Sequence, residues 1–128
     1  MNQIQTLAAP AGRVLLATLF LLAGVQKIGA YEGTLAYMAS QGVPGFMLPI
    51  VIALEVLGAL AIIVGWHTRL VAFLLAGFSL VSALLFHFKP DDAVQMTMLL
   101  KNVAIAGAFL LLVAHGAGAY SIDNRRAA

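Results

Sequence analysis

Long apolar runs alternate with short polar segments along the 128-residue chain, and these runs predict its architecture. A helix needs about 20 predominantly apolar residues to cross the hydrocarbon core of a membrane, which is roughly 30 Å thick. Four runs meet this requirement, at approximately residues 14–31, 46–66, 70–88 and 93–113. The pattern therefore predicts an all-α fold, an integral membrane four-helix bundle, in a single transmembrane domain over residues 1–128.

The connections between these runs are mostly short. Only "HTR", residues 67–69, separates the second run from the third, which predicts a tight antiparallel hairpin with Thr68 as the N-cap of the third helix. The longest connection, residues 32–45, is expected to be either a short helix lying on the membrane or an ordered surface loop. The tail "SIDNRRAA", residues 121–128, is expected to be solvated.

Composition supports a membrane protein and excludes several kinds of chemistry. Hydrophobic residues make up 62% of the chain, against about 45 to 50% in soluble domains. A net charge of +2 is too small for a nucleic-acid-binding face. The apolar composition instead predicts that the lipid bilayer surrounds the protein. The chain has no cysteine, which excludes thiolate nucleophiles, disulfide relays and iron–sulfur ligation. No metal site is expected.

Basic residues predict the orientation of the bundle. Four spans place both termini on one side of the membrane, and the arginines Arg13, Arg69, Arg125 and Arg126 fall on that side. Because cytoplasmic segments carry an excess of Lys and Arg, both termini are predicted to be cytoplasmic. The expected location is the inner membrane of the cell, with a multi-pass topology.

Glu55 stands near the middle of the second apolar run, in "IALEVLGAL". An acidic residue at the centre of a membrane helix costs about 2.5 to 3.5 kcal/mol, so such residues usually face a protein interior and have partners. Glu55 shares its helix face with Gly58, Ala59 and Ile62, and small residues allow close helix packing in lipid. Glu55 is therefore predicted to point into the bundle.

The other three runs also carry one ionisable residue each on a face of small residues. These residues are Lys27, His87 and Lys101. Asn102 points about 100° away from Lys101. At 1.5 Å per residue, Glu55 and Lys101 lie roughly 13 Å and roughly 12 Å from the non-cytoplasmic ends of their helices. The four ionisable groups are therefore predicted to form a polar pocket in the outer half of the bundle.

Such a pocket suits an electron-rich ligand. Two lysines against one carboxylate leave a net positive centre, which an anion or a quinone head group would complete. Glu55 and His87 are the candidate catalytic residues, because a carboxylate and a histidine at the outer mouth provide a proton path. Lys27, Lys101 and Asn102 are the candidate substrate-binding residues. Quinone is the expected cofactor, although no motif encodes it.

Two other functions stay open. An ion pair of Glu55 with Lys27 or Lys101 could serve only to hold two helices together. The chain would then be a non-catalytic membrane scaffold or assembly protein. A small-solute transporter would need a polar path to the cytoplasm, and the inner half of the bundle carries no ionisable group between its helix ends. Apolar outer faces on so small a bundle favour a homo-oligomer or membership of a larger complex.

Several segments together resemble the DoxX family of small four-helix membrane proteins. The segments are "LLATLFLLAGVQKIGAY", "GVPGF", "ALEVLGALAIIVGWHTRL", "LLFHF" and "LLKNVAIAGAFLLL". Their order and spacing make the resemblance specific. The family pattern falls on Gly24, Lys27, Gly42, Pro44, Glu55, Gly58, Gly65, Arg69, His87, Lys101 and Asn102.

The resemblance implies an association with membrane redox chemistry. The family takes its name from a small subunit linked to thiosulfate:quinone oxidoreductase, and other members are associated with oxidoreductase complexes that handle oxidative or thiol stress. For this chain it implies an oxidoreductase subunit that works with a redox partner subunit. A complete thiosulfate oxidase would need an extra soluble domain, so we do not expect this chain to catalyse that reaction alone.

Overall fold

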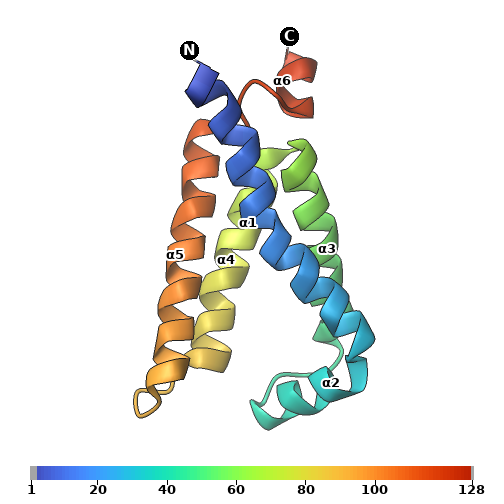
Figure 1. The fold of residues 1–128 in the computed structure, drawn as a ribbon. Coiled ribbons are helices and arrows are strands. Elements are labelled where there is room, and N and C mark those ends of the chain that lie inside the picture. The colour runs from blue at the N-terminus through green and yellow to red at the C-terminus, as the bar shows by residue number, and fades with distance from the viewer. Residues whose placement is uncertain (1–2, 128) are drawn as a thin grey trace.

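The computed structural model describes residues 3–127, and this part of the chain contains helices but no strands. Four segments are long and apolar enough to cross a membrane, which confirms the predicted all-α bundle of four membrane helices. The elements are α1 (Gln3–Gly29), α2 (Tyr31–Ser40), α3 (Met47–Val64), α4 (Thr68–Ser82), the π-helix η1 (Ala83–His87), α5 (Ala93–His115) and α6 (Ile122–Ala127) (Figure 1).

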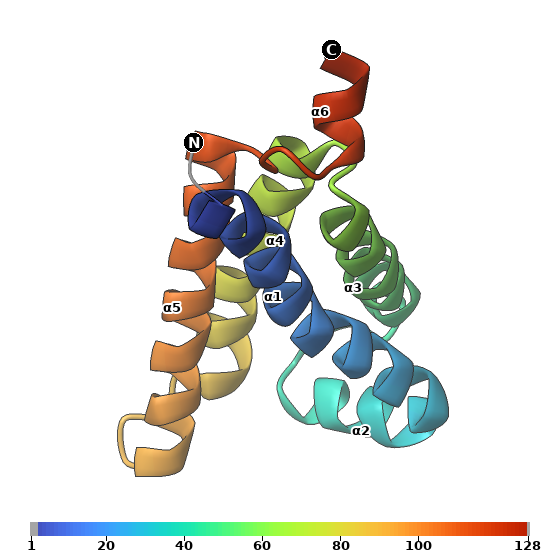
Figure 2. The ribbon, with the colours of Figure 1, turned by 45° about the horizontal axis from the view of Figure 1, so that its top comes forward.

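The membrane helices form two pairs. α1 packs along α3, α4 packs along α5, and a short turn joins α3 to α4. Both ends of the described chain and α6 lie at one end of the bundle, which we call the terminal end (Figure 1, Figure 2). α2 lies across the opposite end, which we call the α2 end. The assignment of the terminal end to the cytoplasm stays a prediction.

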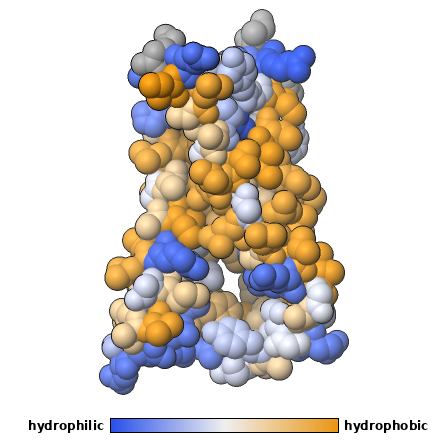
Figure 3. Space-filling model, viewed as in Figure 1, coloured by the Kyte–Doolittle hydropathy of each residue, from blue (hydrophilic) through white to orange (hydrophobic). Residues whose placement is uncertain are grey.

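A broad apolar band covers the outside of the bundle between more polar ends (Figure 3). Large apolar side chains are exposed on every membrane helix, including Leu15 on α1, Leu57 on α3, Phe73 on α4 and Leu111 on α5. A contiguous apolar surface of this extent is typical of a protein that is embedded in lipid.

α1 begins at Gln3, so the helix extends beyond the membrane span predicted at residues 14–31. Its 27 residues form a helix of roughly 40 Å, longer than the hydrocarbon core is thick. Hydropathy identifies only the apolar part of a helix. It therefore does not indicate that the more polar residues before the apolar run are also helical.

Of the two structures expected for residues 32–45, the helix is the one observed. α2 ends before Gly42, whose φ of 75° is a conformation that glycine adopts without strain. Met38 on α2 is buried together with Val43 and Leu48, and this small cluster fastens α2 to the start of α3.

An apolar core fills the bundle between its middle and the terminal end. The ring of Phe20 on α1 packs edge to face against Phe109 on α5 and Phe78 on α4, with centroids 5.3 Å and 6.3 Å apart. All four membrane helices contribute to this core. Its buried members are Ala17, Phe20, Ala59, Ile62, Ala72, Leu75, Ala76, Ala106 and Phe109.

Arg13 is more than a marker of topology, because it lies inside the terminal end and is only 1% exposed. One guanidinium nitrogen donates hydrogen bonds to the carbonyls of Ile62 and Ile63 at 3.0 Å and 2.9 Å, and another donates to that of Tyr120. The last carbonyls of a helix lack partners within it, so Arg13 completes the end of α3. Arg13 is therefore an ionisable group buried at the level where α3 ends.

The C-terminal tail is hydrogen-bonded to the terminal end, although Ile122, Asn124 and Arg125 on it are exposed as expected. The Asp123 carboxylate on α6 accepts hydrogen bonds from the backbone N–H groups of His67 and Thr68 at 2.7 Å and 2.8 Å. The Asp123 N–H donates to the carbonyl of Gly65 at 2.8 Å. His67, rather than Thr68, is the N-cap residue of α4, and its side chain forms no capping hydrogen bond. The Asp123 carboxylate of the tail is the acceptor for the backbone N–H groups at this helix start.

These contacts favour the charged form of Asp123. Burial raises its pKa, but hydrogen bonds from Thr68 and His67, together with the charge of His67, lower it by more, so the pKa of Asp123 lies below its usual value. A carboxyl group with a lowered pKa stabilises the folded state above its unfolded pKa of about 3.9. That contribution is lost as the pH falls through the folded pKa.

Replacing Arg13 should destabilise the protein measurably. Arg13→Met would leave the carbonyls of Ile62, Ile63 and Tyr120 without their donor, and an unsatisfied buried polar group costs about 1 to 3 kcal/mol. We expect a lower midpoint of thermal unfolding in detergent. Arg125→Gln changes an exposed arginine at the same end and serves as the control, with an expected effect within about 0.5 kcal/mol. Equal midpoints for the two variants would contradict this role of Arg13.

Acid should release the tail from α4. Trp66 is the single tryptophan of the chain and adjoins His67, so its fluorescence reports on the contact with Asp123. We expect a change in the signal as the pH falls below about 4, because Asp123 then binds a proton. Asp123→Asn keeps a hydrogen-bond acceptor but does not titrate, so this transition should be absent there. The same transition in the variant would show that another group causes it.

Candidate functional site

Gly24 brings α1 and α3 into close contact toward the α2 end. A Cβ atom at this position would lie 2.6 Å from Cγ2 of Val56 and 3.3 Å from Cβ of Glu55, so the two helices need glycine here. One turn further along α1, Nζ of Lys27 lies 2.9 Å from Oε1 of Glu55. The prediction that Glu55 points into the bundle is confirmed, and its partner is Lys27.

The two members of this ion pair differ in exposure. The side chain of Glu55 is 4% exposed, whereas that of Lys27 is 29% exposed. An ammonium group has three N–H donors, so Lys27 can bind Glu55 and still offer a donor to a ligand. Each charge stabilises the other in a region where an isolated charge would be costly.

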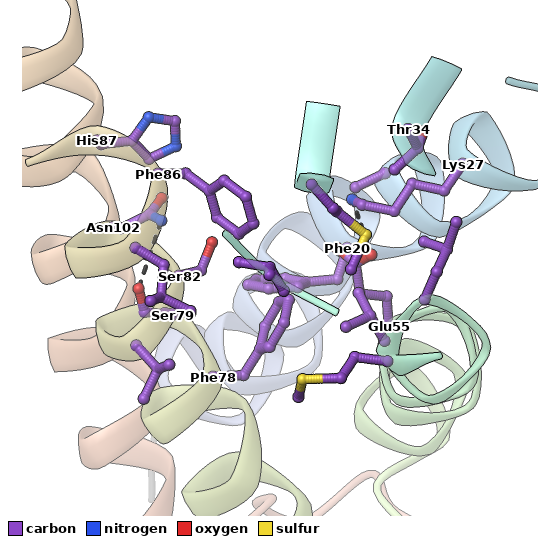
Figure 4. A pocket seen from close by; sticks show the side chains of 18 of the residues that line it. Phe20, Lys27, Thr34, Glu55, Phe78, Ser79, Ser82, Phe86, His87 and Asn102 are labelled. Carbon is purple, nitrogen blue, oxygen red and sulfur yellow. Dashed lines mark hydrogen bonds and ion pairs between the residues drawn. The ribbon is translucent and has the colours of Figure 1, made fainter. Parts of the chain in front are cut away.

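A cavity of about 320 Å³ lies beside the pair, between α1 and α3 on one side and α4 and α5 on the other. Its wall includes every predicted site residue: Lys27, Glu55, His87, Lys101 and Asn102. Figure 4 shows Lys27 and Glu55 on one wall and His87 and Asn102 on the opposite wall, with aromatic rings between them. The sequence therefore identified the residues that meet here, while their chemical roles stay predictions.

The wall opposite Lys27 includes a π-helical turn. η1 replaces the last turn of α4, and single π-helical turns often occur at functional sites. Nδ1 of His87 lies 2.7 Å from Oε1 of Gln95 on α5. An amide oxygen can only accept, so the neutral His87 tautomer that fits this contact carries its proton on Nδ1 and has Nε2 able to accept a hydrogen bond. The Asn102 amide donates to the carbonyl of Ser79 at 3.4 Å, which joins α5 to α4.

Lys101 does not face the bundle interior, so that part of the prediction is wrong. Lys101 and Ala104, which share a helix face, are both exposed, and Lys101 forms no ion pair with a described residue. The buried residues of α5 are Ala106 and Phe109, and Asn102 lies on their side of the helix. Lys101 thus lines the cavity as an exposed residue and does not share in the charge balance of Glu55.

Several contacts of the site carried no signal in the sequence. Gln95, which orients His87, reads as an ordinary polar residue in the first turns of a helix. The ring of Tyr37 on α2 stacks on that of Phe86 in η1, with centroids 5.5 Å apart. Lys89 donates a hydrogen bond to Oε1 of Gln41 at 3.2 Å. The residues of the last two pairs lie far apart in the chain, so no local pattern indicates that they meet.

Known proteins resemble this chain over most of its length. A family model described as DoxX matches residues 8–88. "Inner membrane protein YqjF" of Escherichia coli is 48% identical over 124 residues, which cover 97% of this chain and 95% of the relative. "Inner membrane protein YphA" of Escherichia coli is 42% identical over 120 residues, covering 88% and 86%. "Putative oxidoreductase CatD" of Bacillus subtilis is 34% identical over 64 residues, covering 50% and 48%. No solved structure matches the chain.

The predicted location agrees with these findings. The structure has four apolar helices of membrane-spanning length, and the two Escherichia coli relatives are named inner membrane proteins. The chain is a multi-pass protein of the inner membrane, and its apolar surface contacts the lipid bilayer.

A larger residue at position 24 should force α1 and α3 apart beside the ion pair. Gly24→Leu would press into Val56 and Glu55, and overpacking of this kind costs about 1 to 3 kcal/mol. Gly12→Leu is a matched control on the same helix, because a Cβ at Gly12 would meet nothing within 4 Å. We expect a lower thermal midpoint in detergent for Gly24→Leu only. Equal stability of the two variants would show that the close approach at Gly24 is not required.

Proposed function

This chain belongs to the DoxX family of membrane proteins, and on that premise we propose that it is a membrane subunit of a quinone-linked oxidoreductase system. The cavity holds a quinone head group or a small anion. One observation carries the proposal: the Lys27–Glu55 ion pair, with its 2.9 Å contact, stands in the wall of a cavity toward one end of a membrane bundle. An ion pair that only held two helices together would not need a cavity beside it.

The chemistry of the wall suits a ligand that accepts hydrogen bonds. The Lys27 ammonium offers N–H donors to a quinone carbonyl or to an anion oxygen. Glu55 and Nε2 of His87 are the proton acceptors in the wall. When a quinol is oxidised it releases protons and electrons together, and these two residues take the protons.

The electrons require a redox partner subunit. This chain has no cysteine that could take them as a thiol–disulfide couple. The oxidoreductase name of the Bacillus subtilis relative supports a place in redox chemistry. We therefore assign this chain the binding of the ligand and the handling of its protons, and assign electron transfer to the partner.

A structural role is the second candidate, because the ion pair lies one turn from the tight contact at Gly24. The pair would then hold α1 to α3, and the chain would be a scaffold or assembly protein. A transporter is a weaker candidate, since the apolar core around Phe20 and Phe109 occupies the bundle between the cavity and the terminal end.

Glu55→Gln tests the proposed function against the structural role. Without the carboxylate, the Lys27 ammonium would be an unpaired charge in an apolar region, so its side chain would no longer be held beside the cavity. We expect the affinity for a benzoquinone in nanodiscs to fall at least about tenfold, equivalent to roughly 1.4 kcal/mol. Equilibrium binding measured by native mass spectrometry would report this change.

Two further variants separate the explanations. Glu32→Gln removes an exposed carboxylate on α2 and should leave quinone affinity unchanged. Lys27→Met/Glu55→Gln removes both charges. The scaffold role predicts that this double variant recovers the thermal stability lost in Glu55→Gln and that quinone binding never depends on either residue. Unchanged quinone affinity in Glu55→Gln would refute the proposed function.

A further inference from the structure

The cavity is covered toward the water beyond the α2 end. Met38 and Val43 in its wall are 4% and 9% exposed. α2 and its following turn also reach the opposite helix pair, through the stack of Tyr37 on Phe86 and the hydrogen bond from Lys89 to Gln41. A ligand dissolved in water would therefore meet α2 before it met the ion pair.

The cavity is open toward the lipid. Leu19 on α1 and Val81 on α4 line it and are nevertheless 42% and 55% exposed. Leu19 lies ten residues before the end of α1 at Gly29, and Val81 lies six residues before His87. At 1.5 Å per residue these positions are roughly 15 Å and roughly 9 Å inside the helix ends, within the depth of the hydrocarbon. Figure 3 shows an opening through this face of the molecule near the α2 end.

The size of the cavity limits what it can enclose. A volume of about 320 Å³ is at the lower end of the range of roughly 300 to 1,000 Å³ for small-molecule sites. It accommodates a head group, whereas a long chain attached to that head group would have to continue outside. Among the exposed residues of the wall, Leu19 and Val81 are apolar, as a path for such a chain requires.

We propose that the cavity takes its ligand sideways from the bilayer, and that this ligand is an amphiphile with a hydrogen-bond-accepting head at Lys27 and a long apolar tail that leaves past Leu19 or Val81. The inference rests on the proposed function and narrows it, because it selects a tailed quinone over a small anion from the water. The anion would have to pass the cover formed by α2 or cross hydrocarbon to reach Lys27.

Blocking the sides of the cavity tests this inference. In Leu19→Trp/Val81→Trp, bulky rings would occupy the space that the tail needs. The control is Leu22→Trp/Leu80→Trp, which changes neighbouring residues that are 55% and 41% exposed but do not line the cavity. Each variant would be placed in phosphatidylcholine nanodiscs. Equilibrium binding of an isoprenoid-tailed benzoquinone and of the same head group without its tail would be measured by native mass spectrometry.

The expected result is selective. Leu19→Trp/Val81→Trp should bind the tailed quinone at least tenfold more weakly and the tail-less one within twofold of the wild type, and the control should bind both normally. An equal loss for both ligands, or no loss for either, would overturn sideways entry while leaving the proposed function intact. If the wild-type protein binds neither quinone, the proposed function fails and this inference fails with it.

A second measurement tests the opening without a quinone. The chain has no cysteine, so Leu19→Cys and Glu32→Cys each allow a single spin label. We expect oxygen, which concentrates in lipid, to relax the label at position 19, and a water-soluble nickel chelate to relax the label at position 32. Equal access of the nickel chelate to both labels would show a water-filled mouth and would overturn the inference.

Discussion

The ion pair between Lys27 and Glu55 is the interaction around which the α2 end is organised. Neither charge is tolerable alone among apolar helices, so each side chain is held where it meets the other. Their 2.9 Å contact is possible because Gly24 lets α1 and α3 approach closely. This contact binds α1 to α3, and the cavity lies between that pair of helices and the pair formed by α4 and α5.

The two ends of the bundle are stabilised in different ways. At the terminal end, Arg13 completes the last turn of α3 and Asp123 completes the first turn of α4, so the polar ends of two helices are satisfied by distant side chains. The apolar core around Phe20 adds to this end. Because the helices are fastened there, they can separate toward the α2 end and leave room for a ligand. α2 covers that room from the water and leaves it accessible to lipid.

Much of the fold follows from patterns that are local in the sequence. Four apolar runs predict four helices, and the stripe of Gly58, Ala59 and Ile62 correctly predicts the direction of Glu55 because all three residues are on the buried face of α3. α5 has small residues on more than one face, so the same argument misplaced Lys101. The bulky Phe109 marks the buried face, but a large residue in lipid can equally face outward.

The remaining contacts depend on tertiary structure. Asp123 and His67 lie 56 residues apart, and Arg13 and Ile62 lie 49 residues apart, so no helical period relates them. An arginine before an apolar run is typical of a topology signal, and only the packed bundle reveals that Arg13 is buried. Gln95 likewise gains its meaning only when η1 brings His87 to it.

In the function proposed above, Lys27 binds a ligand in addition to pairing with Glu55. The most direct test is the ¹⁵N resonance of the Lys27 Nζ atom in nanodiscs, assigned with Lys27→Arg, during titration with a tailed benzoquinone. We expect the chemical shift of this resonance to change with quinone concentration until it saturates, and that of Lys89, in the loop before α5, to stay constant. Saturable quinone binding with an unmoved Lys27 resonance would contradict it.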